Sequence, residues 1–263
     1  MKAKFAGLLL AGLVVAGCVT VEVTDNQKSA PPAAVKAALG EVAAGVSEAS
    51  LRGYVEKMVG FGTRHTLSDT IAPTRGIGAA RRWVESEFRA MSTACGGCLQ
   101  IALPSDTVTG PRVPNPTKIV DVVAIQLGTS DPQRVIIIQG HLDSRVSDVM
   151  NFTADAPGAN DDASGVAVVM EAARVLSKRK FGATLVYAAL SGEEQGLLGG
   201  RILADYAKTQ GWQVLAVLNN DIVGNTRGLA QTVEDRVRIF SEGVRSLESE
   251  AQGNARRSVG GEV

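Results

Sequence analysis

The stretch "RVIIIQGHLDS", residues 134–144, is an apolar run that ends in a His and an Asp. A short continuous run of branched apolar residues is typical of a strand buried on both faces, as in a parallel sheet. Three further runs have the same character and predict strands over 118–127 ("KIVDVVAIQL"), 183–190 ("ATLVYAAL") and 213–219 ("QVLAVLN"). The strand at 134–139 is therefore expected to be one member of a buried set.

Helical patterns lie around and between these strands. Apolar residues recur at helical spacing between residues 77 and 91 and again between 169 and 176, and a further helix is expected over about 194–208. Strands that alternate with amphipathic helices indicate an α/β fold in which the sheet is covered on both faces.

Polar residues that suit metal binding follow the predicted strands. They lie after the second strand, at the entrance of the next helix, and after the third and fourth strands: His141, Asp143, Asp161, Glu193, Glu194 and Asp221. In open α/β sheets, ligands bind beyond the carboxyl ends of the strands, where the loops converge. We therefore expect these side chains to meet at one edge of the sheet.

A metal ion explains why so many carboxylates gather there. Crowded carboxylates repel one another unless a cation lies between them. One His with several carboxylates suits zinc or a similar divalent ion, and two ions roughly 3.5–4 Å apart can share a bridging carboxylate. Of the adjacent Glu193 and Glu194, one could bind a metal while the other accepts a proton. Each motif alone also fits a structural role: a His packed after a strand, a solvated helix start or a helix N-cap.

Four motifs together resemble a known family. "GHLDS" (140–144), "PGANDDASG" (157–165), "SGEEQGLLG" (191–199) and "NNDIVGN" (219–225) are similar to the co-catalytic di-zinc aminopeptidases typified by bacterial leucyl aminopeptidase. The resemblance runs from about residue 50 to 228. It implies a three-layer α/β/α sandwich with a mixed, mostly parallel sheet. It also implies a zinc-dependent exopeptidase that hydrolyses amino-terminal peptide bonds of a peptide substrate.

The resemblance also implies a role for each site residue. His141 and Asp221 would bind the first zinc, Asp161 would bridge two zinc ions, and Glu194 would bind the second. Glu193 would be the general base that takes a proton from the metal-bridged water. Asp143 would hold the His141 ring through its far nitrogen. Members of the family carry a cis peptide bond after the bridging Asp, here between Asp161 and Asp162.

The chain departs from the family at the second metal. The family takes a His for that metal from a loop well beyond the fourth strand, whereas this sequence has only His65 and His141. We expect His65 to be structural, and we expect the carboxyl-terminal part of the fold to be missing, which would leave the chain weakly active or inactive. The alternatives are a non-catalytic lipoprotein homologue and, last, a one-metal enzyme such as the glutaminyl cyclases.

The amino-terminal stretch "MKAKFAGLLLAGLVVAGCVT" (1–20) has two Lys followed by an apolar run that is short for a membrane span. Val15 to Cys18 resemble a bacterial lipobox, and the alternative is a plain signal peptide. We expect a lipoprotein signal peptide at 1–17, a tether and leading helix at 18–46, and the catalytic domain at 47–263. The protein would then be a bacterial lipoprotein facing the outer membrane or periplasm, and its lipidated Cys18 would bind the membrane.

The composition bears on nucleic-acid binding and on the role of the cysteines. Lys and Arg together number 27, as do Asp and Glu, so there is no basic surplus of the kind that nucleic-acid binding needs. Cys95 and Cys98 lie in "CGGC". A local disulfide is expected in an oxidising compartment, because a zinc knuckle needs more ligands and a redox motif needs a thioredoxin-like context.

Overall fold

The computed structural model describes residues 32–227 together with residues 232 and 239. The chain divides into two compact units, Met1–Gly40 and Glu41–Val263. The predicted signal peptide and Cys18 lie outside the described residues. Helix α1 (Ala33–Ala44) falls in the segment where we expected a tether and leading helix, and it has no buried residue.

A five-stranded sheet forms the centre of the second unit, in the order β1-β4-β6-β5-β7. Strand β4 pairs antiparallel with β1 and β6, whereas β5 pairs parallel with β6 and β7. The predicted mixed sheet is therefore confirmed, with the parallel strands on the side that carries His141. The strands are β1 (Gln100–Ala102), β4 (Val122–Gln126), β5 (Asp131–His141), β6 (Ala183–Leu190) and β7 (Gln213–Asn219).

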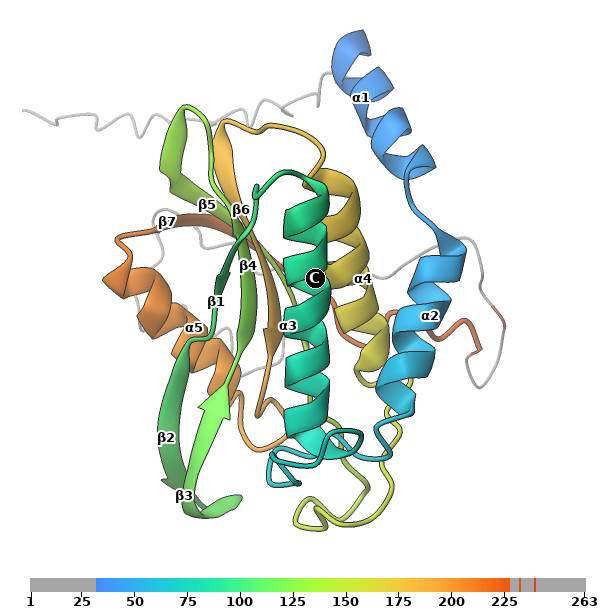
Figure 1. Ribbon diagram of the computed structural model, residues 1–263, viewed down its shortest axis with the longest axis vertical. Helices are drawn as coiled ribbons and strands as arrows, with labels where there is room; N and C mark the ends of the chain where they lie inside the picture. Colours follow the sequence, from blue (N-terminus) through green and yellow to red (C-terminus); the bar gives the residue numbers. More distant parts are fainter. Residues whose placement is uncertain (1–31, 228–231, 233–238, 240–263) are drawn as a thin grey trace, which may run out of the picture. The chain divides into compact units, whose positions relative to one another are not determined.

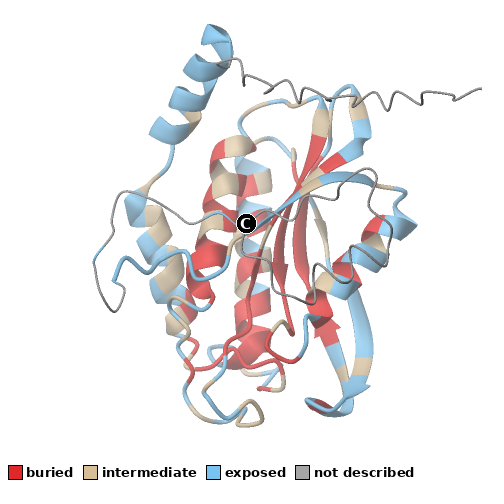
Figure 2. Cartoon of the chain, turned by 180° about the vertical axis from the view of Figure 1, so that it is seen from behind, coloured by how far each residue is buried: buried red, intermediate tan, exposed pale blue. Residues whose placement is uncertain are grey.

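Helices cover both faces of this sheet, as Figure 1 shows. Along β4, Val122 and Ala124 pack with residues of α3 and α4, while Val123 and Ile125 point to the opposite face, where Leu203 of α5 packs. Helix α2 contacts α4 on the first face. In Figure 2 the strongest burial follows the central strands and the inner sides of the helices. The helices are α2 (Glu48–Val59), α3 (Gly76–Ala94), α4 (Ala163–Leu176) and α5 (Leu198–Thr209).

The single strand that we predicted over 118–127 is in fact two. It is divided at Asp121 between β4 and β3 (Val113–Val120), and β3 forms a separate hairpin with β2 (Ser105–Gly110). The Asp121 amide donates to the carbonyl of Pro104 (2.9 Å), and its buried carboxylate accepts from the Ser191 amide (2.9 Å). These bonds hold Asp121 at the junction between the two sheets.

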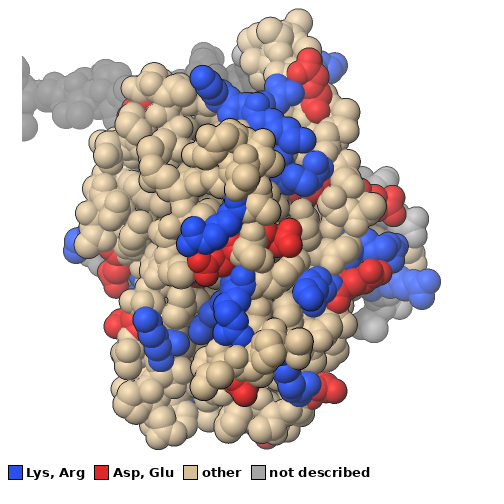
Figure 3. Space-filling view, viewed as in Figure 1, with Lys and Arg blue, Asp and Glu red and all other residues tan. Residues whose placement is uncertain are grey.

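A disulfide bond joins Cys95 and Cys98 just after α3, in line with the expected local bridge. Among the described residues, no helix combines the length and apolarity needed to cross a bilayer. On the face drawn in Figure 3, basic and acidic side chains are interspersed, as the equal numbers of both in the sequence would suggest.

Candidate metal centre

Three parallel strands deliver the predicted site residues to one edge of the sheet. His141 is the last residue of β5, Glu193 follows the end of β6, and Asp221 follows the end of β7. Because the three strands are parallel, their carboxyl ends meet. All three residues line one cavity of about 440 Å³.

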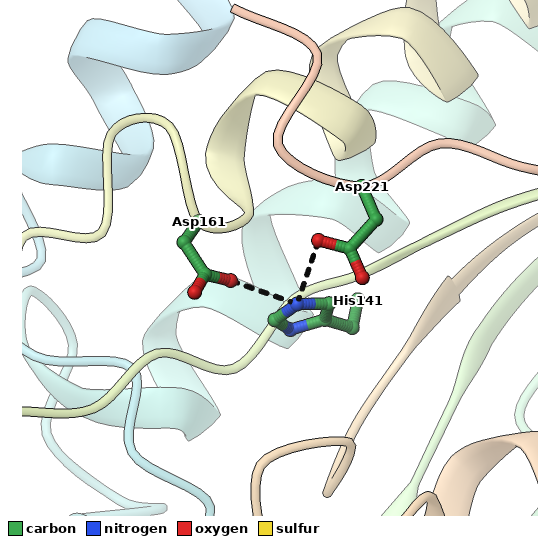
Figure 4. Close-up of side chains that lie close together, drawn as sticks. All are labelled: His141, Asp161 and Asp221. Carbon is green, nitrogen blue, oxygen red and sulfur yellow. Dashed lines mark ion pairs between the residues drawn. The ribbon is translucent and has the colours of Figure 1, made fainter. Parts of the chain in front are cut away.

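The closest group consists of His141, Asp161 and Asp221, shown in Figure 4. His141 Nε2 lies 3.1 Å from Asp161 Oδ1 and 3.8 Å from Asp221 Oδ1. One donor atom from each residue lies within 4.8 Å of the other two. His141 is buried, whereas the carboxylates of Asp161 and Asp221 are exposed to solvent, so a cation entering from solvent would meet all three donors.

The donor set fits a zinc ion. Zinc binds imidazole nitrogen and carboxylate oxygen at about 2.0–2.2 Å in a tetrahedral arrangement, which places neighbouring donors roughly 3.3 Å apart. The two distances from His141 Nε2, 3.1 and 3.8 Å, lie on either side of that separation. Small side-chain movements would therefore let these three residues hold one ion and leave a further position open.

The electrostatics of the site also favour a cation. Burial by itself would lower the pKa of His141, but the carboxylates of Asp143 and Asp221 outweigh it and raise this pKa to about 12. The ring thus lies in a strongly negative environment, in which a proton and a metal ion compete for the same nitrogen.

Asp143 links the end of β5 to the loop after β6. Its fully buried carboxylate accepts from the amides of Glu193 and Glu194, both at 3.1 Å, and from the Thr66 hydroxyl at 2.8 Å. His141 Nδ1 lies 3.1 Å from the carbonyl oxygen of Asp143 and 3.6 Å from its carboxylate. The contact that orients the ring is therefore the backbone carbonyl, and the carboxylate orients the two glutamates.

Asp162 joins three elements and was not singled out from the sequence. It is the N-cap of α4, and its carboxylate accepts from the amides of Gly165 (2.9 Å), His141 (3.0 Å) and Ile222 (3.3 Å). Burial raises the pKa of Asp162 to about 7. The peptide bond between Asp161 and Asp162 is cis, as the resemblance implied.

The adjacent glutamates have different surroundings. Glu193 is partly exposed to the cavity, with Oε2 at 4.0 Å from His141 Nε2, and burial raises its pKa although the charge of His141 opposes this. Glu194 is nearly buried and forms a close ion pair with Arg145. Glu194 therefore lies outside the His141–Asp161–Asp221 group.

His65 is fully buried and fully engaged elsewhere. Its Nδ1 accepts from the Leu67 amide (3.0 Å), and its Nε2 lies 3.1 Å from both the Val149 carbonyl and the Gln195 side-chain nitrogen. These contacts agree with the structural role that we expected.

Besides Asp162, Arg64 and Arg145 lie near the site and were not predicted from the sequence. Arg64 is fully buried beside the loop that leads to Asp161. Arg145 follows "HLDS" directly, and its place two residues after Asp143 was the available signal. Their partners are distant along the chain, so no local pattern identifies the contacts that they make.

The site brings together imidazole and carboxylate donors that suit a metal ion, and a further carboxylate, that of Glu193, lies beside them. Residues 121–260 match the model of peptidase family M28, and the chain belongs to that family. The predicted metallopeptidase family is thereby confirmed.

Similar proteins extend this result. A probable zinc metalloprotease of Pyricularia oryzae is 47% identical over 88% of this chain and 46% of its own length. Another from Leptosphaeria maculans is 43% identical over 89% of this chain and 54% of its own length. The chain thus spans about half the length of the curated relatives it matches.

Solved structures share the fold. LapB from Legionella pneumophila has a TM-score of 0.58 at 22% identity, covering 72% of this chain and 46% of LapB. A leucine aminopeptidase precursor from Bacteroides thetaiotaomicron has a TM-score of 0.55 at 19% identity, covering 68% of this chain and 63% of that one. At such identities the likeness concerns the fold, and it agrees with the sandwich described above.

The comparisons correct the expected localisation. We expected a bacterial lipoprotein facing the outer membrane or periplasm, but relatives at 43–47% identity are fungal proteins. The prediction of a bacterial lipoprotein is therefore wrong. It rested on a four-residue match at the end of a short apolar run, which carries far less information than a match over most of the chain.

Proposed function

We propose that this chain forms the zinc-binding part of an exopeptidase that hydrolyses amino-terminal peptide bonds. The observation that carries the proposal is the convergence of His141, Asp161 and Asp221 on one edge of the sheet, with Glu193 in the same cavity. The fungal relatives named as zinc metalloproteases support zinc as the metal.

In this proposal His141, Asp161 and Asp221 hold one zinc ion. A zinc ion bound there would polarise the scissile carbonyl and make a water molecule more acidic. Asp161 and Glu194 would be the donors that this chain offers to a second ion. The number of ions held by the whole protein is thus a question for measurement.

Glu193 is proposed as the general base. Its amide is fixed by Asp143, which directs the side chain toward the cavity. Burial raises its pKa, and a carboxylate with a raised pKa accepts a proton more readily. Glu193 Oε2 would take the proton of the attacking water and then return it to the leaving amine.

The cavity beside Glu193 supports an exopeptidase that takes one terminal residue. Its walls include Leu190 and Leu197, and its volume is about 440 Å³. Apolar walls of this kind accept the side chain of a terminal residue, while the cleaved bond lies beside Glu193 and His141.

The test is Glu193→Gln in the full chain. Cleavage of an amino-acid anilide should fall by about 10²- to 10⁴-fold, because proton transfer is lost, while zinc content per chain stays the same. The control is Glu85→Gln, which changes an exposed glutamate paired with Arg89 on α3 and should leave both values unchanged.

Two outcomes would contradict the proposal. Turnover retained by Glu193→Gln would remove Glu193 as the base. Equal cleavage of substrates with free and blocked amino ends would exclude an aminopeptidase.

A further inference from the structure

We propose that the guanidinium of Arg145 pairs with the carboxylate of Glu194 and thereby competes with a second zinc ion for it. The two metal positions would then differ strongly in their affinity for zinc. This inference rests on the proposed function in one respect, that His141, Asp161 and Asp221 hold the first ion. It concerns what limits binding at the second position.

The ion pair itself is the first observation. Arg145 Nε donates to Glu194 Oε2 in a close contact between a partly exposed guanidinium and a nearly buried carboxylate. Charge-assisted hydrogen bonds of this kind are stronger than neutral ones, and more so where water is excluded. A metal ion that took Glu194 as a ligand would have to break this bond.

Glu194 is also held in place through its backbone. Its amide donates to Asp143 Oδ2 at 3.1 Å, and its carbonyl accepts from Arg112 Nη1 at 3.0 Å. Because both peptide groups are fixed, the carboxylate can move away from Arg145 only by rotation about its side-chain bonds. The pair is thus part of a fixed arrangement at the end of β6.

Arg145 places its charge at the carboxylate of Glu194. Within the described part of the chain, this is the ion pair that joins an Arg or Lys to a predicted metal ligand. Arg145 therefore supplies positive charge on the Glu194 side of the site.

The remaining donors do not favour a second ion. In the proposed function Asp161 and Glu194 are the donors for this ion, while His65 is occupied by Leu67, Val149 and Gln195. Among the described residues, His141, Asp161 and Asp221 form no ion pair with an Arg or Lys, whereas a second ion must displace the guanidinium of Arg145 from Glu194. We therefore expect one tight and one weak zinc equivalent.

The experiment is a calorimetric titration of the metal-stripped full chain with Zn²⁺, comparing wild type with Arg145→Gln. The second equivalent should bind at least about tenfold more tightly in the variant, which corresponds to removing one competing charge-assisted hydrogen bond. The first equivalent should change by less than about threefold, because its ligands do not contact Arg145.

Two further variants separate competition from a general effect of charge. Arg112→Gln removes an equal charge that touches the carbonyl of Glu194 and not its carboxylate, and should leave the second equivalent unchanged. In a Glu194→Gln background, Arg145→Gln should no longer have an effect on it. Thermal unfolding of each variant verifies that it is folded, and Arg145→Met serves as a second neutral replacement.

The proposal is overturned if Arg145→Gln and Arg145→Met leave the second equivalent unchanged, or if Arg112→Gln strengthens it equally. A wild-type chain that binds no zinc would contradict the metal site itself and hence both proposals. A chain that binds zinc as expected but cleaves no peptide would contradict the proposed function and leave the competition standing.

Discussion

Arg64 donates to four carbonyl groups from separate parts of the chain. Its Nε bonds Leu142 (2.7 Å), and its terminal nitrogens bond Pro157 (2.7 Å), Gly158 (3.0 Å) and Met58 (3.1 Å). Burial lowers its pKa to about 10, which still leaves it charged at neutral pH. Since Leu142 adjoins His141 and Gly158 leads to Asp161, Arg64 positions two predicted ligands relative to each other.

We expect Arg64→Lys to weaken binding of the first zinc by about 10- to 100-fold, the usual effect of removing a group that supports metal ligands. A single ammonium cannot reproduce the planar fork that reaches all four carbonyls. Calorimetric zinc affinity and the midpoint of thermal unfolding are the measurements, and kcat should fall more than KM rises.

The matched control is Arg82→Lys, because Arg82 also donates to three carbonyls, those of Thr70, Ile71 and Ala72, but at the exposed surface. Zinc affinity should not change in this variant. Unchanged affinity in Arg64→Lys as well would show that Arg64 supports the fold without positioning the ligands.

Single residues also show how far the sequence could predict the site. His141, Glu193 and Asp221 were predicted to converge because each follows a buried strand, and that rule depends only on local pattern. The pairing of Glu194 with Arg145 was not predicted, because the two residues lie 49 positions apart in the sequence. Ion pairs and carbonyl contacts between distant segments leave no periodic signal.

At the scale of elements, two adjacent glycines at the start of α5 have opposite surroundings. A Cβ at Gly199 would lie 2.5 Å from Asp121 Oδ1 and 2.6 Å from the Ser191 carbonyl oxygen, whereas a Cβ at Gly200 would have nothing within 4 Å. Of these two glycines, only Gly199 is needed for the close approach of α5 to the end of β6.

Replacing each glycine with alanine tests this contact. Gly199→Ala should destabilise the fold by about 1–3 kcal/mol through overpacking. Gly200→Ala should stabilise it by roughly 0.5–1 kcal/mol, because alanine loses less freedom in a helix. Urea unfolding followed by circular dichroism measures both. A neutral Gly199→Ala would mean that α5 can move away from Ser191 freely.

The elements missed from the sequence lack a clear hydrophobic pattern. Strand β2 is mostly polar ("SDTVTG") and β3 begins "VPNP", so neither shows the apolar run or alternation that marks a strand. Strands β5, β6 and β7 were predicted well because they pair in the parallel part of the sheet and are correspondingly apolar. Prediction followed continuous apolar runs, which include the exposed β7, and failed at the polar hairpin.

At the scale of the whole molecule, buried Asp121 makes stability depend on pH. Burial raises its pKa from 3.8 to about 8, although the Ser191 amide and Arg81 oppose this. The folded state therefore binds a proton that the unfolded chain has already released. The stability that this proton contributes is fully present below the unfolded pKa and is lost as pH rises through about 8.

We predict that the free energy of unfolding of the wild type falls between about pH 5 and pH 9, and that Asp121→Asn reduces this slope. Asparagine can still accept from the Ser191 amide but carries no titrating group. Asp162, with its pKa raised to about 7 by burial, contributes with the same sign and stays present in both proteins. Parallel curves for the two proteins would exclude Asp121 as a source of the slope.

The whole-molecule predictions from sequence had mixed outcomes. Fold and family follow from four ordered motifs spread over three strand ends, a pattern that few folds could satisfy. The localisation followed from one short apolar run and a cysteine, which many unrelated chains could carry. Long-range consistency among motifs explains the difference.

The two strands that supply His141 and Asp221 differ in how firmly the sheet holds them. Strand β5 has a hydrogen-bonded neighbour on each side, whereas β7, in the described part of the sheet, has one and exposes Val217 and Leu218. A cation held by both residues would join an edge strand, which is prone to local opening, to a strand that is paired on both sides. The metal centre would then hold the edge of the sheet in place, and loss of the metal would first increase local opening of β7.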